Sequence, residues 1–410
     1  MVDAGSHGEV LSEGTVNTPV VSVIIPVHNA EDVVAEAVRS CLDQTLGDIE
    51  VLCIENNSTD GSVGVLEEVA ALDQRVQVLD LGRPTRGPGA ARNLGLHVAR
   101  GEFIAFLDSD DKYTPNALEA MVSLLRSNDL DIAMCSIDTF TESRRHRSRC
   151  GYASFLPSLR DPESFTIEDL GPDLFGLRFA ACNKVYRSDF LRENGLRFSE
   201  ETFYEDLNFT FPAMIRARRM GYVPSVLYLN RKDRESATTH LRGDRVADAP
   251  KQFDRFRRFL DDEGLESLED HFRAFEFRKL LNYLPHNDRA SLPGFFDELR
   301  EAASTMSESA VELVGEREQL ARHQLVEAHD LVDFLLWSLW QERLSRQRLR
   351  RRLSRMKHRM ARQSRRGLLG SLGAGMRSFA VRRARRLRRA LRPVWPGPIP
   401  AALKRLVDPR

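Results

Sequence analysis

Hydrophobic and polar positions fall into alternating blocks from residue 20 to residue 136. Short runs of apolar, β-branched residues are typical of strands buried in a parallel sheet. Longer stretches with an apolar residue at every third or fourth position are typical of amphipathic helices. The pattern predicts strands over residues 20–27, 49–54, 76–81, 103–107 and 130–136, and helices over 31–46, 60–72, 89–99 and 115–127. Because strand and helix alternate, we predict an α/β fold with a doubly wound, mostly parallel sheet flanked by helices.

The pattern changes beyond residue 136. Residues 141–162 are polar and indicate a surface excursion, whereas 183–194 and 204–219 predict helices and 222–228 predicts a strand. Residues 250–340 have a helical period, and their expected core residues are Phe253, Phe256, Phe259, Phe272, Phe275 and Phe277. We therefore expect a flexible leader (1–19), an α/β domain (20–245), a helical accessory region (246–340) and a basic amphipathic helical tail (341–410).

Charge is distributed unevenly although the formal net charge is zero. The segment from Arg343 to the end has 23 Lys or Arg against one acid, Asp408, which leaves 37 against 59 in residues 1–342. One face of the tail carries the apolar residues Met376, Ala380, Ala384, Leu387 and Leu391. A basic helix with such a face suits an anionic membrane surface. Nucleic acid attracts the same arginines, but the apolar face favours lipid, so nucleic acid is the disfavoured partner. A solvated tail is the third alternative.

The cysteines and the leader indicate the compartment. The chain has five cysteines, Cys41, Cys53, Cys135, Cys150 and Cys182. Their odd number and the lack of C-x-x-C spacing argue against a disulfide framework or a zinc site. The leader lacks the basic and apolar regions of a secretory signal, and no apolar run approaches the roughly 20 residues of a spanning helix. We expect a cytoplasmic protein that is peripherally associated with the inner face of the membrane through its tail.

Clustered carboxylates follow the predicted strand over residues 103–107, in the run Asp108-Ser109-Asp110-Asp111. In sheets of this class, ligands bind at the carboxyl ends of the strands. Carboxylate oxygens are suitable ligands for Mg²⁺ or Mn²⁺, and such an ion could hold a diphosphate. Asp and Ser are also common in ordinary turns, so the run alone does not decide between the two interpretations. A dinucleotide loop at Gly87-Pro88-Gly89 is excluded because Arg92 occupies its last glycine position.

A series of ordered motifs resembles the family 2 glycosyltransferases over about residues 20–240. They include V-S-V-I-I-P-V-H-N-A-E from Val21, I-E-N-N-S-T-D-G from Ile54, A-R-N-L-G from Ala91, the D-S-D-D run, N-K-V-Y-R from Asn183 and Y-E-D from Tyr204. The resemblance implies a GT-A fold, a nucleotide-sugar donor and transfer with inversion. The helical accessory region (246–340) is then expected to follow the GT-A fold as a C-terminal region.

The resemblance also assigns residues to the donor. It places Pro26 and His28 beside the base, although the family usually has Tyr where His28 stands. Glu55 occupies the position of an Asp that contacts the uracil, so UDP is favoured but the nucleotide remains open. Arg92 would reach the base or the phosphates. Alternatively, Glu55 belongs to a polar turn that caps the helix expected from residue 60. Arg92 could likewise form only an ion pair at the surface.

By the same resemblance, Asp110 binds the metal directly and Asp108 contacts the ribose or the metal, with Asp111 behind them. Asp206 is the general base that takes the proton of the acceptor hydroxyl, and Glu205 is its substitute. Acids in a first helical turn also occur for dipole reasons alone. The segment after residue 228 matches one that closes over the diphosphate, with Arg231, Arg234 and Ser236 as candidates. His240 is either a metal ligand or a solvated loop residue.

These features predict an inverting glycosyltransferase that uses Mg²⁺ or Mn²⁺. Its donor would be a nucleotide-diphosphate sugar, with a UDP-sugar favoured. Its acceptor would be a hydroxyl of a cell-envelope glycan, a polymer or a lipid-linked molecule. The alternative is a non-catalytic nucleic-acid-binding or scaffold protein that retains a degenerate transferase domain and a basic tail. Hydrolysis of a donor separates the two hypotheses.

Overall fold

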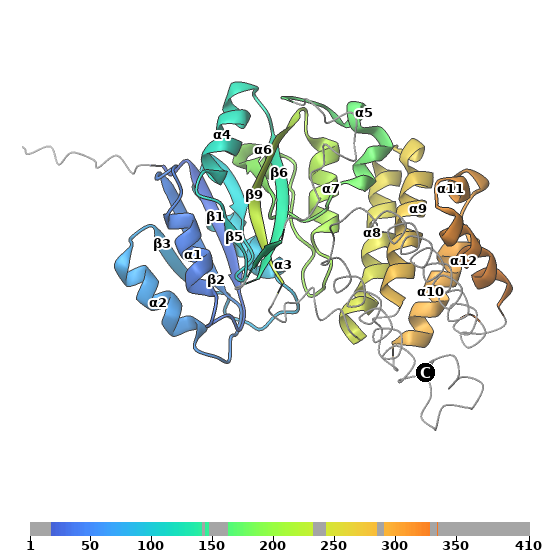
Figure 1. Cartoon of the computed structure of the whole chain (residues 1–410), viewed down its shortest axis with the longest axis horizontal. Helices are drawn as coiled ribbons and strands as arrows, with labels where there is room; N and C mark the ends of the chain where they lie inside the picture. Colours follow the sequence, from blue (N-terminus) through green and yellow to red (C-terminus); the bar gives the residue numbers. More distant parts are fainter. Residues whose placement is uncertain are drawn as a thin grey trace, which may run out of the picture. The chain divides into compact units, whose positions relative to one another are not determined.

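The computed structural model describes residues 18–141, 144–146, 163–232, 243–284, 291–328 and 334. The chain divides into two compact units (Figure 1). The first unit contains the residues up to 166 together with 181–197 and 216–231, and the second contains 167–180, 198–215 and the residues from 232 onward. The expected tail (341–410) lies outside the described residues, and so does nearly all of the expected leader.

One mixed sheet forms the centre of the first unit. Its described strands are β1 (Val21–Val27), β2 (Ile49–Glu55), β3 (Val76–Asp80), β4 (Phe103–Phe106), β5 (Lys112–Tyr113), β6 (Ile132–Thr141), β7 (Arg144–His146), β8 (Lys184–Arg187) and β9 (Met220–Arg231). They are ordered β3-β2-β1-β4-β8-β6-β9-β5, with β7 paired to β6. Strands β1 to β4 are parallel, β8 is antiparallel to β4 and β6, and β9 is parallel to β6. Strands β1 to β4, β6 and β9 therefore end at the same edge, which we call the carboxyl edge.

Helices cover the sheet and supply much of its core. Those of the first unit are α1 (Val34–Leu42), α2 (Ser62–Leu72), α3 (Gly89–Val98), α4 (Ala117–Ser127) and α6 (Ser188–Glu193). Helix α2 packs on β3 and beside α1, while α3 packs on β1 and β2. In α1 the buried residues Val34, Ala37, Val38 and Cys41 are spaced as one helical face. The expected α/β architecture is confirmed, since apolar strands alternate with amphipathic helices.

The structure differs from the predicted elements mainly in the second half of the sheet. Residues 183–194 were expected to form one helix, but they form strand β8 followed by α6. Val185 and Tyr186 are fully buried between β4 and β6, so tertiary pairing decides the conformation of this short segment. Strand β9 is longer than the predicted 222–228 for the same reason, because it pairs along β6.

A buried polar network fastens β1, β2 and the residues before β4. The hydroxyl of Ser22 donates to Glu50 at 2.5 Å and accepts the N–H of Gly101 at 2.8 Å. Glu50 also pairs with the Arg100 guanidinium at 2.8 Å. Burial raises the pKa of Glu50, but the hydrogen bonds from Ser22 and Arg100 outweigh it and keep the pKa below its usual range. The network leaves no room at Gly101, where a Cβ would lie 2.5 Å from the backbone nitrogen of Ser22.

Gly101→Ala is therefore expected to lower the free energy of unfolding by about 1–3 kcal/mol, because the new methyl group meets backbone rather than a movable side chain. Gly47→Ala is the matched control, since nothing lies within 4 Å of a Cβ at that position. The urea midpoints of the two variants and the wild type provide the measurement. Equal midpoints for Gly101→Ala and Gly47→Ala would contradict the expectation.

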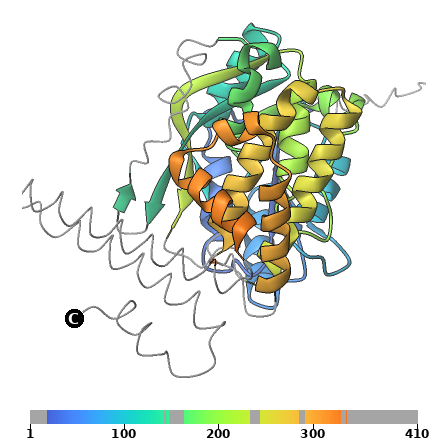
Figure 2. The ribbon, with the colours of Figure 1, turned by 90° about the vertical axis from the view of Figure 1, so that its right-hand side faces the viewer.

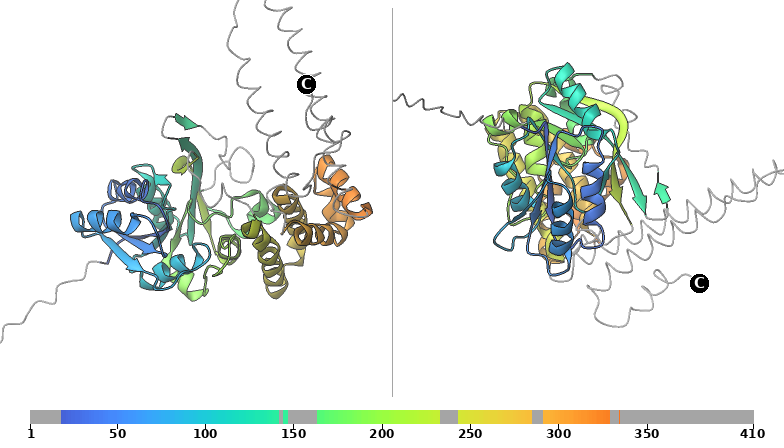
Figure 3. Two further views of the ribbon diagram at one scale, coloured as in Figure 1. Left: turned by 90° about the horizontal axis from the view of Figure 1, so that it is seen from below. Right: turned by 90° about the vertical axis from the view of Figure 1, so that its left-hand side faces the viewer.

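Helices dominate the described part of the second unit. They are α5 (Ile167–Leu170), η3 (Gly171–Gly176), α7 (Leu207–Arg216), η4 (Gly243–Asp248), α8 (Ala249–Asp262), α9 (Glu266–Tyr283), α10 (Leu292–Ser304), α11 (Glu308–Glu312) and α12 (Glu316–Glu327). Helices α8 to α12 gather into a bundle, coloured yellow to orange in Figures 2 and 3. Among the described helices, none has the length and the apolar composition of a membrane-spanning segment.

Phenylalanine rings form the core of this unit. The expected core residues Phe253, Phe256, Phe272, Phe275 and Phe277 are buried. Phe259 is half-buried and stacks on Phe256 at 5.7 Å between ring centroids. Phe175 and Phe211, which the sequence did not single out, join the cluster, with their ring centroids 5.5 Å apart. Aromatic pairs at these distances contribute beyond their buried area, so the helical period correctly predicted where this core lies.

Candidate active site

The loops that follow β1 and β2 at the carboxyl edge are tied to each other. The Thr59 N–H donates to the Asn29 side-chain oxygen at 2.7 Å, and the Ala30 N–H donates to the Ser62 hydroxyl at 2.7 Å. Asn29 and Asn57 have positive φ angles of 50° and 57°, a conformation that Asn tolerates better than most residues. The two loops therefore form one fixed wall of the edge.

His28 lies on this wall with its ring exposed. Its Nδ1 is 2.8 Å from the Asn56 carbonyl oxygen, so Nδ1 carries the proton and donates it. The Nε2 atom accepts from the Asn29 amide at 3.4 Å. Pro26 is half-buried in β1, opposite Ile54 in the strand register. Both residues expected beside the base thus belong to this edge, and the imidazole is held in one orientation with its face available for stacking.

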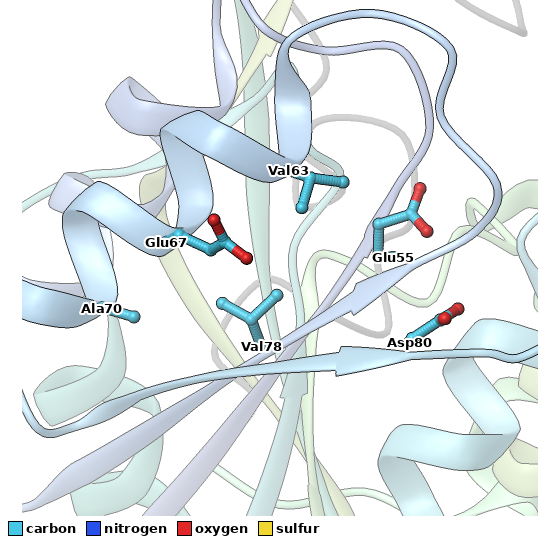
Figure 4. Close-up of a pocket in the computed structure, with 6 residues that line it drawn as sticks. All are labelled: Glu55, Val63, Glu67, Ala70, Val78 and Asp80. Atoms are coloured by element: carbon cyan, nitrogen blue, oxygen red, sulfur yellow. The ribbon is translucent and has the colours of Figure 1, made fainter.

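Glu55 and Asn56 have different roles at the end of β2. Asn56 accepts from the Thr85 hydroxyl at 3.0 Å and donates to the Gly87 carbonyl at 3.3 Å, so it fastens the loop before α3. Glu55 accepts the Ser58 N–H and borders a hollow of about 590 Å³. Figure 4 shows the residues that line this hollow, which are Glu55, Val63, Glu67, Ala70, Val78 and Asp80. The Glu55 carboxylate therefore combines a turn contact with access to a cavity.

Arg92 and Asp108 form an ion pair at the edge. The guanidinium of Arg92, whose side chain is 4% exposed, donates to Asp108 Oδ1 at 2.8 Å. Asp108 is 37% exposed, so one partner is buried and the other reaches solvent. The surface ion pair considered as the alternative does not describe Arg92, because its side chain is buried in the first turns of α3. Arg92 fixes the orientation of Asp108 and places a positive charge beneath the edge.

Asp111 is the buried member of the carboxylate run, at 2% exposure. Its carboxylate accepts from the Tyr228 hydroxyl at 2.7 Å, from the Asn230 amide at 2.9 Å and from the Arg231 N–H at 2.7 Å. Burial and the carboxylates of Asp108 and Asp110 raise the pKa of Asp111, and the hydrogen bonds from Asn230 and Tyr228 oppose this shift. Asp111 fastens the D-S-D-D turn to β9 rather than facing a ligand.

Arg231 supports the same turn at the end of β9. Its Nε donates to the Asp110 main-chain oxygen at 2.9 Å, and its guanidinium pairs with Glu36 and lies 4.6 Å from the centroid of the Phe140 ring. The Asp110 side chain stays half-buried at the edge. The first unit thus brings Asp108, Asp110 and Arg231 together, while Arg234, Ser236 and His240 lie outside the described residues.

Glu205 and Asp206 belong to the second unit, directly before α7. The Asp206 carbonyl accepts the N–H of Thr210 at 2.8 Å, so this residue begins the helix. Gln252 of α8 fastens the loop on both sides. Its amide donates to the Thr202 hydroxyl at 3.1 Å and accepts from the Asn208 amide at 2.8 Å. Tyr204, which precedes the two acids, has a positive φ of 67°, and such backbone strain is often found at functional sites.

Lys184 is a residue to which the sequence reasoning gave no role. Its side chain is fully buried at the start of β8, where Nζ lies 3.0 Å from the Asn183 side-chain oxygen. Since β8 runs antiparallel to β4, the start of β8 lies at the carboxyl edge. Buried lysines are rare unless they are paired or functional. The N-K-V-Y-R motif was the signal that could have singled it out.

The carboxyl edge fits a metal that is shared with a ligand. In the described residues, no group of three or more His, Cys, Asp or Glu side chains is arranged to hold a metal by itself. Mg²⁺ usually takes one or two protein carboxylates and completes its octahedron with phosphate oxygens and water. Asp108 and Asp110 provide that number of hard oxygen donors at the exposed end of the turn, so the donor set is compatible with Mg²⁺ or Mn²⁺.

Comparison with known proteins gives matches to glycosyltransferases over the first part of the chain. Residues 22–186 match the family model described as "Glycosyl transferase family 2". The chain is 32% identical over 214 residues to "Putative glycosyltransferase EpsH" of Bacillus subtilis (strain 168), an alignment covering 52% of this chain and 60% of EpsH. It is 28% identical over 204 residues to "Poly(ribitol-phosphate) beta-glucosyltransferase" of Bacillus spizizenii, covering 49% of this chain and 30% of that protein. The chain thus spans less than two thirds of either relative.

A solved structure has the same fold. S. aureus TarS (residues 1–349), in complex with UDP-GlcNAc, superimposes with a TM-score of 0.58 and 20% identity, over 78% of this chain and 91% of that one. This similarity supports a GT-A fold with a helical C-terminal region. The part of the chain from β1 to β8 thus matches glycosyl transferase family 2, and the solved structure adds the fold.

Proposed function

We propose that the chain is an inverting glycosyltransferase that transfers a sugar from a nucleotide-diphosphate donor to a hydroxyl of a cell-envelope glycan, a polymer or a lipid-linked acceptor. The observation that carries the proposal is the fastened D-S-D-D turn, with Asp108 held by Arg92 and Asp111 held by β9. The names of the relatives support the reaction and the class of acceptor. The UDP-GlcNAc complex of TarS supports a UDP-sugar as the donor.

The proposed donor site uses the carboxyl edge of the first unit. His28 stacks on the base, with Pro26 beside it, and Glu55 accepts an N–H of the base. Asp108 and Asp110 hold Mg²⁺ or Mn²⁺ against the diphosphate. The ion, when bound, neutralises the charge that grows on the departing diphosphate. Arg92 and Lys184 add fixed positive charge beneath the same edge, and their burial strengthens this contribution.

The proposed base is Asp206, with Glu205 as the substitute. As the acceptor oxygen attacks the anomeric carbon from the face opposite the diphosphate, the carboxylate takes the hydroxyl proton. Attack from that face inverts the anomeric configuration. Gln252 holds the loop that carries the base, through Thr202 and Asn208. We assign it a positioning role because the hydrogen bonds of its side chain join Thr202, before the two acids, to Asn208, after them.

The remaining assignments concern closure of the site and location in the cell. We assign Arg231 to holding the Asp110 turn, in line with its contact to the Asp110 carbonyl. Arg234 and Ser236 would close over the diphosphate. The basic tail would bind an anionic membrane surface at the cytoplasmic face, where envelope precursors carry their lipid. The absence of a spanning helix among the described residues is compatible with such peripheral binding.

Nucleotide binding tests the proposal directly. UDP, GDP, CDP and ADP are added to the full chain with and without Mn²⁺, and the thermal midpoint is measured. We expect UDP with Mn²⁺ to give the largest stabilisation, by mass action about 2.7 kcal/mol at 100 times the Kd. A parallel assay measures release of the nucleoside diphosphate from common sugar donors. If no nucleotide stabilises the chain and no donor releases its nucleoside diphosphate, the enzymatic proposal is wrong and the scaffold alternative is favoured.

A further inference from the structure

Glu36 lies on the exposed side of α1 and contacts two cations from distant parts of the chain. Its side chain is 46% exposed, and it pairs with the Lys112 ammonium and with the Arg231 guanidinium. Lys112 begins β5 directly after the D-S-D-D run, and Arg231 ends β9. Helix α1 packs beside β5, and all three residues belong to the first unit. Glu36 therefore links α1 to the strand that follows the carboxylate run and to the end of β9.

Arg231 is the buried member of this cluster, with 4% of its side chain exposed. Its Nε donates to the Asp110 main-chain oxygen at 2.9 Å, and its backbone N–H donates to Asp111 Oδ1 at 2.7 Å. A terminal nitrogen of the guanidinium donates to Glu36 Oε2. Because the guanidinium is planar and rigid, contacts at two of its nitrogens fix its orientation. Glu36 thus holds the far end of the group whose Nε contacts the turn.

The Phe140 ring lies against both cations. Its centroid is 4.4 Å from Lys112 Nζ and 4.6 Å from the central carbon of the Arg231 guanidinium. A ring attracts a cation through its quadrupole, an interaction that is less directional than a hydrogen bond. The two cations also repel each other, and the charge of the Glu36 carboxylate offsets this repulsion. Glu36 therefore adds what the ring does not provide, a directed hydrogen bond to each cation.

A purely structural role is the simpler explanation of the Glu36 contacts. An ion pair with a half-exposed carboxylate contributes little to the stability of a fold, since solvent screens it. The hydrogen bonds from Arg231, however, converge on Asp110 and Asp111 in the D-S-D-D turn. The Asp110 side chain lies half-buried at the exposed end of this turn. The effect of losing Glu36 is therefore expected at the turn rather than in the stability of the first unit.

We propose that Glu36 is a positioning residue for the divalent metal. It acts through Arg231, which fixes the main chain of Asp110, so that the Asp110 carboxylate keeps the orientation that binds Mg²⁺ or Mn²⁺. The role of Asp110 as a metal ligand rests on the proposed function, whereas the path of contacts from Glu36 to Asp110 does not. Residues that orient a metal ligand from outside the coordination sphere commonly change metal affinity by about 10–100-fold.

Binding of UDP to the full chain, measured by calorimetry with and without Mn²⁺, tests this role. The ratio of the two dissociation constants is the contribution of the metal, and a general loss of stability does not change this ratio. Glu36→Gln removes the charge and nearly keeps the shape of the side chain. Glu68→Gln, at an exposed position of α2, is the matched control. Arg231→Gln, alone and combined with Glu36→Gln, tests whether Glu36 acts through Arg231.

We expect the metal contribution to fall about tenfold in Glu36→Gln and to stay within about twofold of the wild type in Glu68→Gln. The dissociation constant of UDP without Mn²⁺ should change in neither variant, because the base contacts belong to other residues. Arg231→Gln should lower the metal contribution at least as much as Glu36→Gln does. The double variant should match Arg231→Gln, because both effects follow one path of contacts.

Equal metal contributions in Glu36→Gln and Glu68→Gln would overturn the positioning role. Losses that multiply in the double variant would also overturn it, because Glu36 would then act independently of Arg231. If Arg231→Gln does not fold, the comparison of Glu36→Gln with Glu68→Gln decides alone. A wild type that binds UDP equally well without Mn²⁺ would instead contradict the metal of the proposed function. Failure of the Glu36 role alone leaves that Mn²⁺ dependence intact.

Discussion

Asp206→Asn is expected to lower the rate of sugar transfer by about 10²–10⁴-fold, the usual contribution of a general base. The amide has the shape of the carboxylate but cannot take the proton of the acceptor hydroxyl. Donor binding should not change, because the residues proposed to hold the base and the metal lie in the first unit. The backbone bond from Thr210 to the Asp206 carbonyl does not depend on the side chain, so α7 keeps its first turn.

The measurement is transfer of labelled sugar to a cell-envelope acceptor fraction, with metal-dependent UDP binding as the check on the donor site. Asp261→Asn, which changes an exposed acid of the same unit, should leave transfer within about twofold of the wild type. Glu205→Gln should cost less than Asp206→Asn. If Glu205→Gln abolishes transfer and Asp206→Asn does not, the base is Glu205. If both variants transfer at the wild-type rate, the proposed mechanism is wrong.

Local sequence predicts the first half of the sheet well, because its strands carry their own signal. Strands β1 and β2 are β-branched runs that are buried on both faces, and such runs form parallel strands largely regardless of partner. Strand β5 has two residues and exists because Lys112 and Tyr113 pair with β9. Strand β8 is similarly short and depends on its neighbours. Short strands of this kind are decided by tertiary contacts, which no local pattern contains.

In the candidate site, too, some contacts can be predicted from the sequence and others depend on tertiary structure. The rule that strand ends share one edge predicts that Arg92 and Asp108 lie near each other, and the structure has them bonded. It does not predict that Asp111 is buried under Tyr228 and Arg231, because these partners are more than 100 residues away in the chain. The resemblance implies only that Asp111 lies behind Asp108 and Asp110, and it names no partner for Asp111. Burial separates Asp111, which fastens the turn, from the more exposed Asp108.

Asp110→Asn is expected to abolish the Mn²⁺ dependence of UDP binding and to lower transfer by about 10²–10³-fold, a typical loss when one charge-stabilising group is removed. The amide is a poorer ligand for a hard divalent cation than the carboxylate. The contact from Arg231 to the turn should survive the change, because it uses the main-chain oxygen of Asp110. The thermal midpoint without ligand should therefore stay near that of the wild type.

Asp111→Asn gives the contrasting result that makes this prediction specific. Its carboxylate accepts from Tyr228, Asn230 and the Arg231 N–H, and an amide would place an N–H group against these donors. We expect a loss of about 1–3 kcal/mol in the free energy of unfolding, with Mn²⁺ dependence of UDP binding retained. Asp48→Asn, at an exposed position before β2, is the control for loss of one carboxylate. The opposite outcome is that UDP binding still depends on Mn²⁺ in Asp110→Asn, while Asp111→Asn loses this dependence at unchanged stability. In that case Asp111 is the metal ligand and Asp110 is not.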